Sequence, residues 1–199
     1  MDRSLILAMA LGYLLGSIPF GLVLTRMFGK GDLRAIGSGN IGATNVLRTG
    51  SKPLAALTLV LDCLKATAAV LLAQRLVGWG MGPAAGAAAF IGHLYPVWLR
   101  FRGGKGVATL LGILIPLLWP AAIAYAAIWV ILLLTIRISS VAGMTAALSA
   151  PVTAAILHSM LLPMLLGLAL LVLWKHRENI LRLMKGTEPR IGSKISPTA

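Results

Sequence analysis

The sequence is poor in charged residues, and poorest in acidic ones. Charged residues make up 12% of the 199 residues and hydrophobic residues 58%, whereas a soluble domain carries about 25% charged residues. So little polar surface argues against a water-soluble globule of this size. The 5 acidic residues are outnumbered by 18 Lys and Arg, which gives a net charge of +13. This combination is typical of a membrane protein whose loops hold the charge. Because the apolar runs leave no soluble basic domain, we expect no nucleic-acid binding.

Cysteine is nearly absent. The single cysteine, Cys63, lies inside an apolar run, so no disulfide framework can form within one chain, and we expect a buried, inert thiol. The first apolar run extends to about Phe28 without a small-residue cleavage site followed by a soluble domain. We therefore expect a retained transmembrane helix there, and not a signal peptide.

Long apolar stretches make up most of the chain. A spanning helix needs about 20 mostly apolar residues to cross about 30 Å of hydrocarbon. The candidate stretches are Ser4–Thr25, Pro53–Gln74, Gly82–Leu99, Val107–Ile136 and Ser139–Trp174. The fourth is interrupted by Pro116 and Pro120, and the fifth has His158 and Pro163 near its middle. Each of these two can be read as one long helix or as two crossings.

The distribution of positive charge decides between these topologies. If both long stretches cross twice, Arg3 and Arg75 fall on one side of the membrane, and Lys65 stays inside a helix. The other side then holds Arg26, Lys30, Arg34, Arg48, Lys52, Arg100, Arg102, Lys105, Arg137, Lys175, Arg177, Arg182, Lys185, Arg190 and Lys194. A single crossing at 107–136 would divide the same charges almost evenly. Because cytoplasmic loops carry the excess of Lys and Arg, the sequence predicts one all-α, polytopic membrane domain over residues 1–199. It has seven transmembrane helices, the N-terminus outside and the C-terminus in the cytoplasm.

The first polar segment, GSGNIGATNVLR at residues 37–48, contains the spacing G-x-G-x-x-G. A dinucleotide-binding fold is excluded because that fold needs a βαβ unit, and membrane helices flank this segment. Glycine still lets several backbone N–H groups point at one anion. Hydrogen-bonding side chains and a guanidinium stand beside the glycines, so we expect phosphate or carboxylate binding. The candidates are Ser38, Gly39, Asn40, Thr44, Asn45 and Arg48. The alternative is a polar turn.

The second polar segment, at residues 92–109, places Lys105 among Gly103, Gly104 and Gly106. It is not a Walker loop, because Gly106 follows the lysine where Ser or Thr would bind magnesium. An ammonium flanked by bare backbone suits a phosphate that approaches closely. The alternative is a basic loop on anionic lipid headgroups. His93, at a helix end, is open to a structural or a functional interpretation.

The third polar segment covers residues 175–188. On a helix, His176 and Asn179 share one face, so they can address one ligand. The alternative is an amphipathic basic tail at the membrane surface. Separately, Asp62 and Lys65 lie three residues apart within a predicted span. Charges there are costly and face a cavity or each other, which leaves two readings: a self-contained ion pair, or a Lys65 that lines the anion site.

Several catalytic patterns are missing from these segments. No pair of carboxylates suits glycosidic chemistry, no Cys, His and acidic residues have metal spacing, and no serine lies in a G-x-S-x-G elbow. A site rich in phosphate binders and poor in nucleophiles suits substrates that bring their own reactivity. A phosphorylated, lipid-derived substrate fits.

The segments GSGNIGATNVLR, GHLYPVWLRFRGGKGVAT and HRENILRLMKGTE together resemble the three signature segments of the bacterial acyl-phosphate:glycerol-3-phosphate acyltransferases. The resemblance covers most of the chain, in order and length. It implies seven transmembrane helices in the cytoplasmic membrane of a bacterium. It also implies transfer of a fatty acyl group from acyl phosphate to the 1-hydroxyl of glycerol 3-phosphate. The products are lysophosphatidic acid and phosphate, in the first step of phospholipid synthesis, and no cofactor, metal or obligate protein partner is implied.

The resemblance also suggests roles for the candidate residues. Ser38, Gly39 and the neighbouring backbone would bind the acyl-phosphate end. The groups around glycerol 3-phosphate and the transferring phosphate would be Asn45, Arg48, Lys105, His176 and Asn179, supported by Asn40, Thr44, Gly103 and Gly104. The hydroxyl proton would go to His176 or to a substrate phosphate. How the residues divide between the two substrates stays open, as do the acyl chain-length preference and the oligomeric state.

Two other functions compete with this interpretation. A transporter or binding protein for a phosphorylated metabolite or lipid would favour a midplane site and internal repeats, whereas the polar segments here lie at one interface and no repeat is present. An acyltransferase that uses acyl-CoA would be expected to carry a His-x4-Asp box. The residues five positions after His93, His158 and His176 are Trp98, Pro163 and Leu181, so that box is missing.

Overall fold

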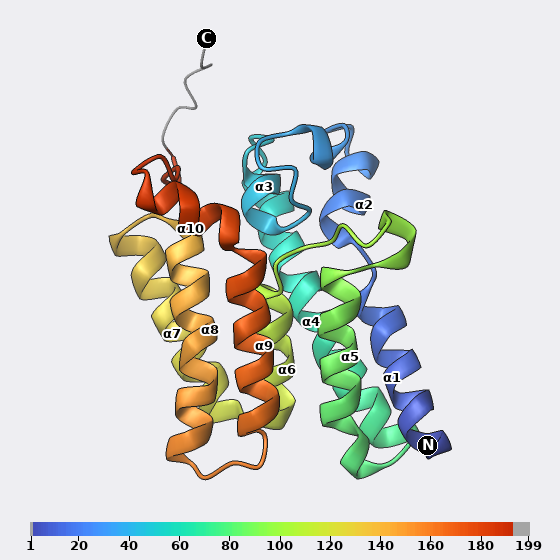
Figure 1. The fold of residues 1–199 in the computed structure, drawn as a ribbon. Coiled ribbons are helices and arrows are strands. Elements are labelled where there is room, and N and C mark those ends of the chain that lie inside the picture. The colour runs from blue at the N-terminus through green and yellow to red at the C-terminus, as the bar shows by residue number, and fades with distance from the viewer. Residues whose placement is uncertain (1, 193–199) are drawn as a thin grey trace. The chain divides into compact units, whose positions relative to one another are not determined.

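The computed structural model of the chain describes residues 2–192, and every regular element in that range is a helix (Figure 1). Lys194, which the charge count above includes, lies outside the described residues. The chain forms two compact units, with the division between Ala122 and Ile123, inside helix α7 (Trp119–Thr135).

The first unit contains the first two polar segments. Its helices are α1 (Arg3–Gly16), α2 (Phe20–Met27), α3 (Ala43–Leu47), α4 (Lys52–Leu76), α5 (Gly82–Leu94) and α6 (Val107–Leu117), with 3₁₀ turns η1 (Leu33–Ala35), η2 (Trp79–Met81) and η3 (Val97–Leu99). Helix α4 is central, since it packs against α1, α2, α3, α5 and α6.

Glycines set how closely the helices of the first unit approach. A Cβ atom added to Gly12 or Gly16 of α1 would collide with the backbone of Ala85 or Ala89 of α5. Between α4 and α6, a Cβ on Gly112 would collide with the carbonyl of Cys63. Small residues allow this contact between helix backbones in lipid, where packing replaces the hydrophobic driving force. Cys63, expected to be buried, is half-buried.

The first predicted span is broken into two helices. Helix α1 ends at Gly16, and α2 begins after Pro19. Proline has no N–H and its ring clashes with the preceding turn of a helix, so the uninterrupted helix expected from Ser4 to Thr25 does not form. The break leaves backbone carbonyls that need partners inside the protein.

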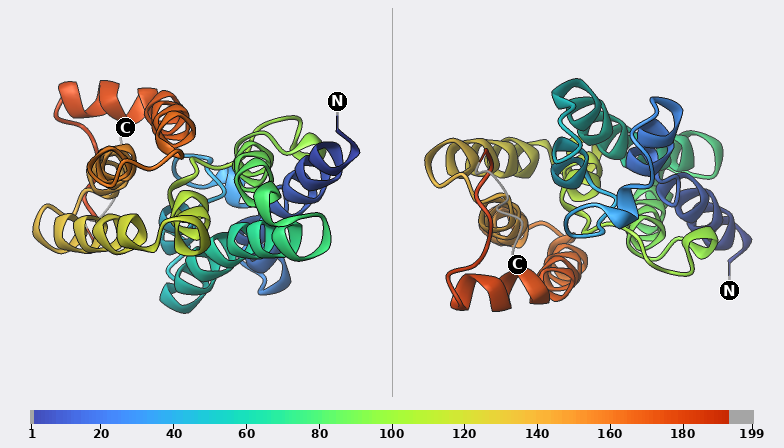
Figure 2. Two further views of the ribbon diagram at one scale, coloured as in Figure 1. Left: turned by 90° about the horizontal axis from the view of Figure 1, so that it is seen from below. Right: turned by 90° about the horizontal axis from the view of Figure 1, so that it is seen from above.

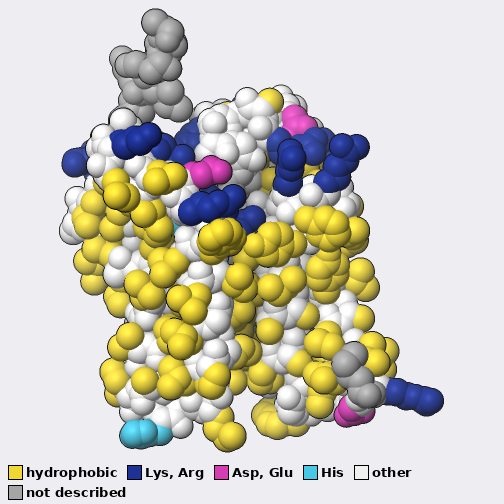
Figure 3. All heavy atoms as spheres, in the orientation of Figure 1, with side chains coloured by type: hydrophobic (Ala, Val, Ile, Leu, Met, Phe, Trp, Pro, Cys, Tyr) yellow, Lys and Arg dark blue, Asp and Glu magenta, His cyan; other side chains and the backbone are white. Residues whose placement is uncertain are grey.

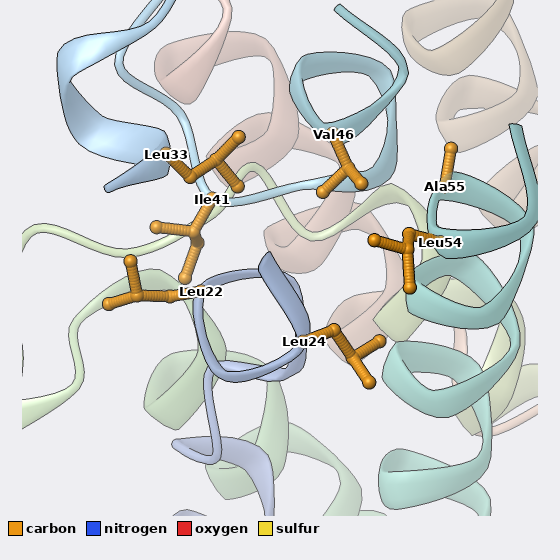
Figure 4. Close-up of a cluster of buried hydrophobic side chains, with 7 residues drawn as sticks. All are labelled: Leu22, Leu24, Leu33, Ile41, Val46, Leu54 and Ala55. Atoms are coloured by element: carbon orange, nitrogen blue, oxygen red, sulfur yellow. The ribbon is translucent and has the colours of Figure 1, made fainter. Parts of the chain in front are cut away.

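A cluster of buried apolar side chains holds the first polar segment on the helices (Figure 4). Leu22 and Leu24 come from α2, Leu33 from η1, Ile41 from the loop before α3, Val46 from α3, and Leu54 and Ala55 from α4. Leu99, in the second polar segment, packs against the same cluster. The two segments are therefore joined by a shared apolar contact.

The second unit contains the rest of α7, then α8 (Ser139–Ile156), α9 (Leu162–Lys175) and α10 (Arg177–Met184). Helices α8 and α9 pack together. In Figure 2 α9 is seen end-on while α10 is seen from the side, so the chain turns sharply between them, at His176. Beyond α10 the chain returns to Arg137, whose carbonyl accepts from Ile191 N at 2.7 Å and whose Nη2 donates to Ile191 O at 2.9 Å.

The expected breaks in the two long apolar stretches are confirmed. Residues 107–136 form α6 and α7, separated at Leu118, and residues 139–174 form α8 and α9. In residues 2–192, three helical segments are long and apolar enough to cross a membrane, namely Arg3–Met27, Lys52–Leu76 and Ser139–Ile156. The other apolar helices are shorter. Helix α5 ends at Leu94, five residues before the expected Leu99, because the chain turns into η3 after Pro96.

Charged side chains gather at one end of each unit, considered by itself (Figure 3). In the first unit, most Lys and Arg lie at the end that carries α2 and α3, although basic and acidic side chains are also visible at the opposite end. In the second, Lys and Arg lie at the end that carries α10. Apolar side chains cover the helices between the two ends of each unit. Within each unit, this is the distribution expected of helices surrounded by lipid, with Lys and Arg gathered at one end.

Candidate active site

Asn45 organises the first polar segment. It is 2% exposed, and its amide nitrogen donates to the carbonyls of Leu33 and Ile36, both at 2.9 Å. Its Oδ1 accepts from Ser38 N at 3.2 Å and from Arg48 Nη1 at 3.3 Å. One buried amide therefore fixes the loop before α3 and the side chain after it.

Arg48 lies directly over Gly37. A Cβ added to Gly37 would lie 2.8 Å from Arg48 Nη1 and 2.7 Å from Asn45 Oδ1. Gly37 also has φ +54°, a backbone conformation that is unfavourable for residues other than glycine. Glycine at this position thus serves two needs, the turn itself and the space for the guanidinium.

The remaining candidates of this segment lie on the same loop. Ser38 and Thr44 are exposed, and Asn40 is half-buried. Ser38 Oγ lies 3.5 Å from Asn45 Oδ1, and Asn40 Oδ1 accepts from Gly42 N at 2.8 Å. Gly39 has φ +66°. The structure thus brings Ser38, Asn45 and Arg48 into one hydrogen-bonded group, with Asn40 holding the turn beside them.

Not every cation near this loop is available to a ligand. Asp32 bonds Arg34 at 2.6 Å and Arg26 at 3.1 Å. The hydrogen bonds from Arg34, with a smaller contribution from Arg26, hold the pKa of the Asp32 carboxyl well below its usual range. Asp32 therefore stays ionised and partly neutralises both arginines.

The second polar segment folds back onto the end of α5. Gly103 N donates to Leu94 O at 3.1 Å, and Gly104 N donates to His93 O at 3.0 Å. A Cβ on Gly103 would collide with the His93 carbonyl, and a Cβ on Gly104 with the His93 imidazole at Nε2. Glycine is needed here so that the loop can approach α5 closely. The positions where side chains of Gly103 and Gly104 would project are occupied by His93. Close packing against α5 therefore explains why glycines precede Lys105.

Contacts with the first helix and its C-cap also hold this loop. Tyr13 OH donates to Tyr95 O at 2.9 Å and accepts from Val97 N at 3.1 Å. Trp98 Nε1 donates to Ser17 O at 2.8 Å. Lys105 is half-buried at the end of this anchored loop, one residue before Gly106 caps α6. The backbone that presents Lys105 is therefore fixed to both α1 and α5.

Below this loop lies a buried group of three ionisable residues. Lys65 Nζ is 2.6 Å from Asp62 Oδ1, and the two side chains are 2% and 4% exposed. Lys65 Nζ also lies 2.9 Å from His93 Nδ1 and donates to Ile18 O at 2.7 Å. The interpretation of Asp62 and Lys65 as an ion pair is confirmed, and His93 extends it. His93 is thus a buried, hydrogen-bonded residue.

The third polar segment belongs to the second unit. His176, at the turn between α9 and α10, is 3% exposed, and its Nδ1 lies 2.8 Å from Val172 O. A carbonyl only accepts, so Nδ1 carries the hydrogen and Nε2 is the basic atom of the neutral ring. Asn179 is 7% exposed, and its Nδ2 donates to Glu188 Oε1 at 2.6 Å.

Glu188 ties this segment together. Besides the bond from Asn179, its carboxylate accepts from Ser140 Oγ and from Arg182 Nε, both at 2.7 Å. Burial by itself would raise the pKa of Glu188, but the hydrogen bonds from Ser140, Asn179 and Arg182 outweigh it and hold the pKa below its ordinary value. Glu188 therefore connects α10 to the start of α8 as an ionised group.

Sequence reasoning missed three of these organising contacts. It gave no role to Glu188 or to Tyr13, and it did not connect His93 to Lys65. The sequence did contain a signal for the contact between His93 and Lys65, namely a histidine at a helix end and a charged residue inside a predicted span. The sequence alone does not show that these two residues meet. In residues 2–192, no three His, Cys, Asp or Glu side chains are placed to hold a metal ion.

Comparison with known proteins places the chain in a family. The sequence profile of the family described as glycerol-3-phosphate acyltransferase matches residues 6–186. The glycerol-3-phosphate acyltransferase of Nitrobacter winogradskyi is 55% identical over 190 residues, which cover 95% of this chain and 97% of that protein. That of Brucella anthropi is 54% identical over 198 residues, which cover 98% and 96%.

Two solved structures have the same fold. Both are crystal structures of PlsY, an integral membrane glycerol 3-phosphate acyltransferase. The glycerol 3-phosphate form has a TM-score of 0.88 and 39% identity, and the lysophosphatidic acid form has a TM-score of 0.85 and 38% identity. Each comparison covers 95% of this chain and 96% of the other. The chain is an integral membrane protein, and it belongs to the glycerol-3-phosphate acyltransferase family.

Proposed function

We propose that this protein transfers a fatty acyl group from acyl phosphate to the 1-hydroxyl of glycerol 3-phosphate, giving lysophosphatidic acid and phosphate. The observation that carries the proposal is the family match over residues 6–186, which includes all but two residues of the three polar segments. The PlsY structures with glycerol 3-phosphate and with lysophosphatidic acid support these compounds as substrate and product here. The reaction would take place at the cytoplasmic membrane of a bacterium.

The chemistry needs little from the protein beyond positioning and charge. Acyl phosphate is a mixed anhydride, so phosphate is already a good leaving group. The 1-hydroxyl oxygen forms a bond to the acyl carbon, the bond from that carbon to the phosphate oxygen breaks, and the hydroxyl proton moves to a base. Two substrate anions repel each other, so the protein must hold both and stabilise the negative charge on the carbonyl oxygen.

The first unit supplies the groups suited to that task. Ser38 and the backbone near Gly39 bind the acyl-phosphate end. Arg48 binds phosphate through its planar guanidinium, which matches two oxygens at once, while Asn45 orients it. Lys105 supplies a compact charge from the anchored loop of Gly103 and Gly104. Asn40 and Thr44 complete the polar loop.

Two acceptors are open to the hydroxyl proton. A substrate phosphate needs no protein base, and we favour it because the group at His176 Nδ1 is the neutral carbonyl of Val172 and not a carboxylate. His176 is the alternative, and Val172 O fixes its Nε2 as the basic atom. Asn179, held by Glu188, contributes an amide to the glycerol 3-phosphate site. Replacing His176 with Gln separates the two routes. If a substrate phosphate accepts the proton, kcat of His176→Gln should keep the pH dependence of the wild-type enzyme, whereas loss of that dependence would indicate His176 as the base.

The topology proposed for this activity has seven crossings in a single domain spanning residues 1–199. The N-terminus lies outside, and the three polar segments at 37–48, 92–109 and 175–188 lie on the cytoplasmic face. Its support is the charge asymmetry of the sequence, together with the helix breaks at Leu118 and between Ile156 and Leu162. A basic rim on one side holds both anions near the headgroups of the inner leaflet.

A direct assay tests the activity. The purified protein receives acyl phosphate and glycerol 3-phosphate, and released phosphate and lysophosphatidic acid are measured against a boiled control. Parallel reactions with acyl-CoA and acyl carrier protein test the donor. Replacing Lys105 with Ala should remove most activity, whereas Lys30→Ala, in an exposed loop between α2 and η1, should not. No product above the boiled control would overturn the proposal, and near-normal turnover by Lys105→Ala would remove that residue from the site.

The same material tests the competing transport function. Vesicles containing the protein are incubated with labelled glycerol 3-phosphate alone. Uptake without acyl phosphate, and without conversion to lysophosphatidic acid, would favour the transporter.

A further inference from the structure

Lys65 makes three polar contacts deep within the first unit, each to a different element or turn. They are Asp62 Oδ1 on α4 at 2.6 Å, the carbonyl of Ile18 between α1 and α2 at 2.7 Å, and His93 Nδ1 on α5 at 2.9 Å. The Phe20 ring centroid also lies 5.8 Å from the ammonium, at the distance of a cation–π contact. All three ionisable side chains are 5% exposed or less.

These contacts determine which nitrogen of His93 carries the hydrogen. An ammonium has three N–H donors and no acceptor. Lys65 Nζ and Asp62 Oδ1 lie 2.6 Å apart, and we take the pair as an ammonium that donates a charge-assisted hydrogen bond to a carboxylate. The other two ammonium hydrogens point at the Ile18 carbonyl and His93 Nδ1. Nδ1 must therefore accept, and the hydrogen of the neutral ring is on Nε2.

The Nε2 edge of His93 faces the part of the second polar segment that carries Gly104. A Cβ on Gly104 would collide with Nε2, so this edge lies against the loop that leads to Lys105. The His93 backbone is part of the same contact, because His93 O accepts from Gly104 N at 3.0 Å. The ring and the carbonyl of one residue thus form the surface on which the loop rests.

We propose that Lys65 is a positioning residue, which holds His93 in the Nε2–H tautomer and thereby fixes the loop that presents Lys105. Charges inside a membrane helix are expensive, and they are retained where they serve function. A pair that served only to neutralise itself would need no third partner. Lys65 instead joins the break after α1 to the end of α5, the two places that anchor this loop.

The tautomer is tested without reference to catalysis. The protein is labelled with ¹⁵N-histidine in detergent, and two-bond nitrogen–proton couplings are recorded at a pH where the imidazoles are neutral. The chain has 3 histidines, and His93→Asn assigns the signal of His93. We expect His93 to carry its hydrogen on Nε2 and His176 to carry it on Nδ1, so the two serve as mutual references. A hydrogen on Nδ1 of His93 would overturn the proposal.

Kinetics test the consequence, and this part rests on the proposed function. Lys65→Met removes the donor but keeps an unbranched side chain. We expect kcat to fall about 10- to 100-fold, the scale of a small misplacement of a catalytic group. The neighbouring Leu64→Met, on the exposed side of α4, is the control and should keep wild-type kcat.

A double variant separates positioning from charge balance. Lys65→Met alone leaves Asp62 buried without its partner, which is destabilising, so this variant can fail by unfolding. Asp62→Asn with Lys65→Met removes both charges and should restore thermal stability. If Lys65 positions His93, kcat stays low in the folded double variant and the His93 couplings no longer indicate a single tautomer. Recovery of wild-type kcat would show that the pair only balances charge, and would overturn the proposal. If the wild-type enzyme itself makes no product, the proposed function fails while the tautomer result still stands.

Discussion

Arg48 and Gly37 are in contact across the turn that precedes α3, and the guanidinium occupies the space that any other side chain at position 37 would need. A Cβ there would lie 2.7 Å from Arg48 Cδ and 2.8 Å from Nη1. The position of the proposed phosphate-binding guanidinium is therefore set partly by the absence of a side chain eleven residues earlier.

Gly37→Ala should displace Arg48 without removing it. We expect kcat/KM to fall about 10- to 100-fold, since a hydrogen bond to a charged group contributes about 1.5–3 kcal/mol. Gly50→Ala is the matched control, because Gly50 also has positive φ, at +85°, but a Cβ there would meet nothing within 4 Å. Both variants carry a similar backbone strain of about 1–2 kcal/mol. Equal activities for the two would show that Arg48 does not need this space.

Gly104→Ala should push the second polar segment away from α5. The added methyl group collides with the His93 imidazole, which is buried and held by Lys65, so the ring cannot easily yield. We expect at least about tenfold lower kcat, because Lys105 moves with the loop. Gly80→Ala, in an open turn where a Cβ would meet nothing within 4 Å, should behave as wild type. Full activity in Gly104→Ala would contradict the described packing.

Asn45→Leu keeps the approximate volume of the side chain but removes its hydrogen bonds. The carbonyls of Leu33 and Ile36 would both lose the amide that they accept from. Each buried group left without a partner costs about 1–3 kcal/mol, so the midpoint of thermal unfolding in detergent should fall clearly. Asn40→Ala, which loses one bond to Gly42 N, should cause a smaller decrease. The reverse order would mean that Asn40 is the main support of the loop.

Glu188→Gln should weaken the second unit in a way that depends on pH. The wild-type carboxylate accepts from Ser140, Asn179 and Arg182, whereas an amide nitrogen placed there opposes one of these donors. Because the pKa of Glu188 is lowered in the folded protein, its stabilising effect is fully present above the unfolded pKa, about 4.3. It is lost as the pH falls through the folded pKa.

The measurement for Glu188 is the unfolding temperature of both proteins across a pH series. Wild type should be the more stable near pH 7, and the two curves should converge in acid. Ser149→Ala is the control, because Ser149 Oγ donates only within α8. The change in unfolding temperature that it causes should be independent of pH. A difference between wild type and Glu188→Gln that is constant down to the most acidic sample would refute the ionised carboxylate.

Single cysteines test the proposed topology. Cys63 is the only cysteine, so Cys63→Ser gives a clean background in which Gly80→Cys and Lys30→Cys are introduced separately. In intact spheroplasts, an impermeant maleimide should label residue 80, between α4 and α5, and should leave residue 30, between α2 and α3, unlabelled until the membrane is opened. Labelling of both positions from outside would reject the assigned orientation.

The arrangement of helices was largely predictable, because lipid imposes simple rules on length and charge. Pro116 and Pro120 indicated a break, and the positive-charge distribution required it. The break at Pro19 was missed because one proline near the end of an apolar run does not tell whether the helix stops there. It is stable since Lys65 supplies a donor to the carbonyl of Ile18, a contact between residues far apart in sequence.

The residues of the candidate site could be predicted from the sequence, but the contacts that each residue makes could not. The pattern placed Ser38, Asn45 and Arg48 in one loop, and the structure joins them. It did not indicate that the amide nitrogen of Asn45 donates to two backbone carbonyls. Nor did it indicate that glycine is required at positions 103 and 104 because His93 lies against them. Such roles follow from which groups meet in three dimensions, and hydrophobic and charge patterns carry no information about that.

The contact of Gly12 and Gly16 with Ala85 and Ala89 has a consequence for how a lipid substrate enters. Where the backbones of α1 and α5 touch, a methylene chain has no room to pass between them. An acyl tail therefore cannot slide in from the bilayer through this seam. A tail that enters from the bilayer has to use another route, because the pair α1 and α5 forms a closed wall of the first unit.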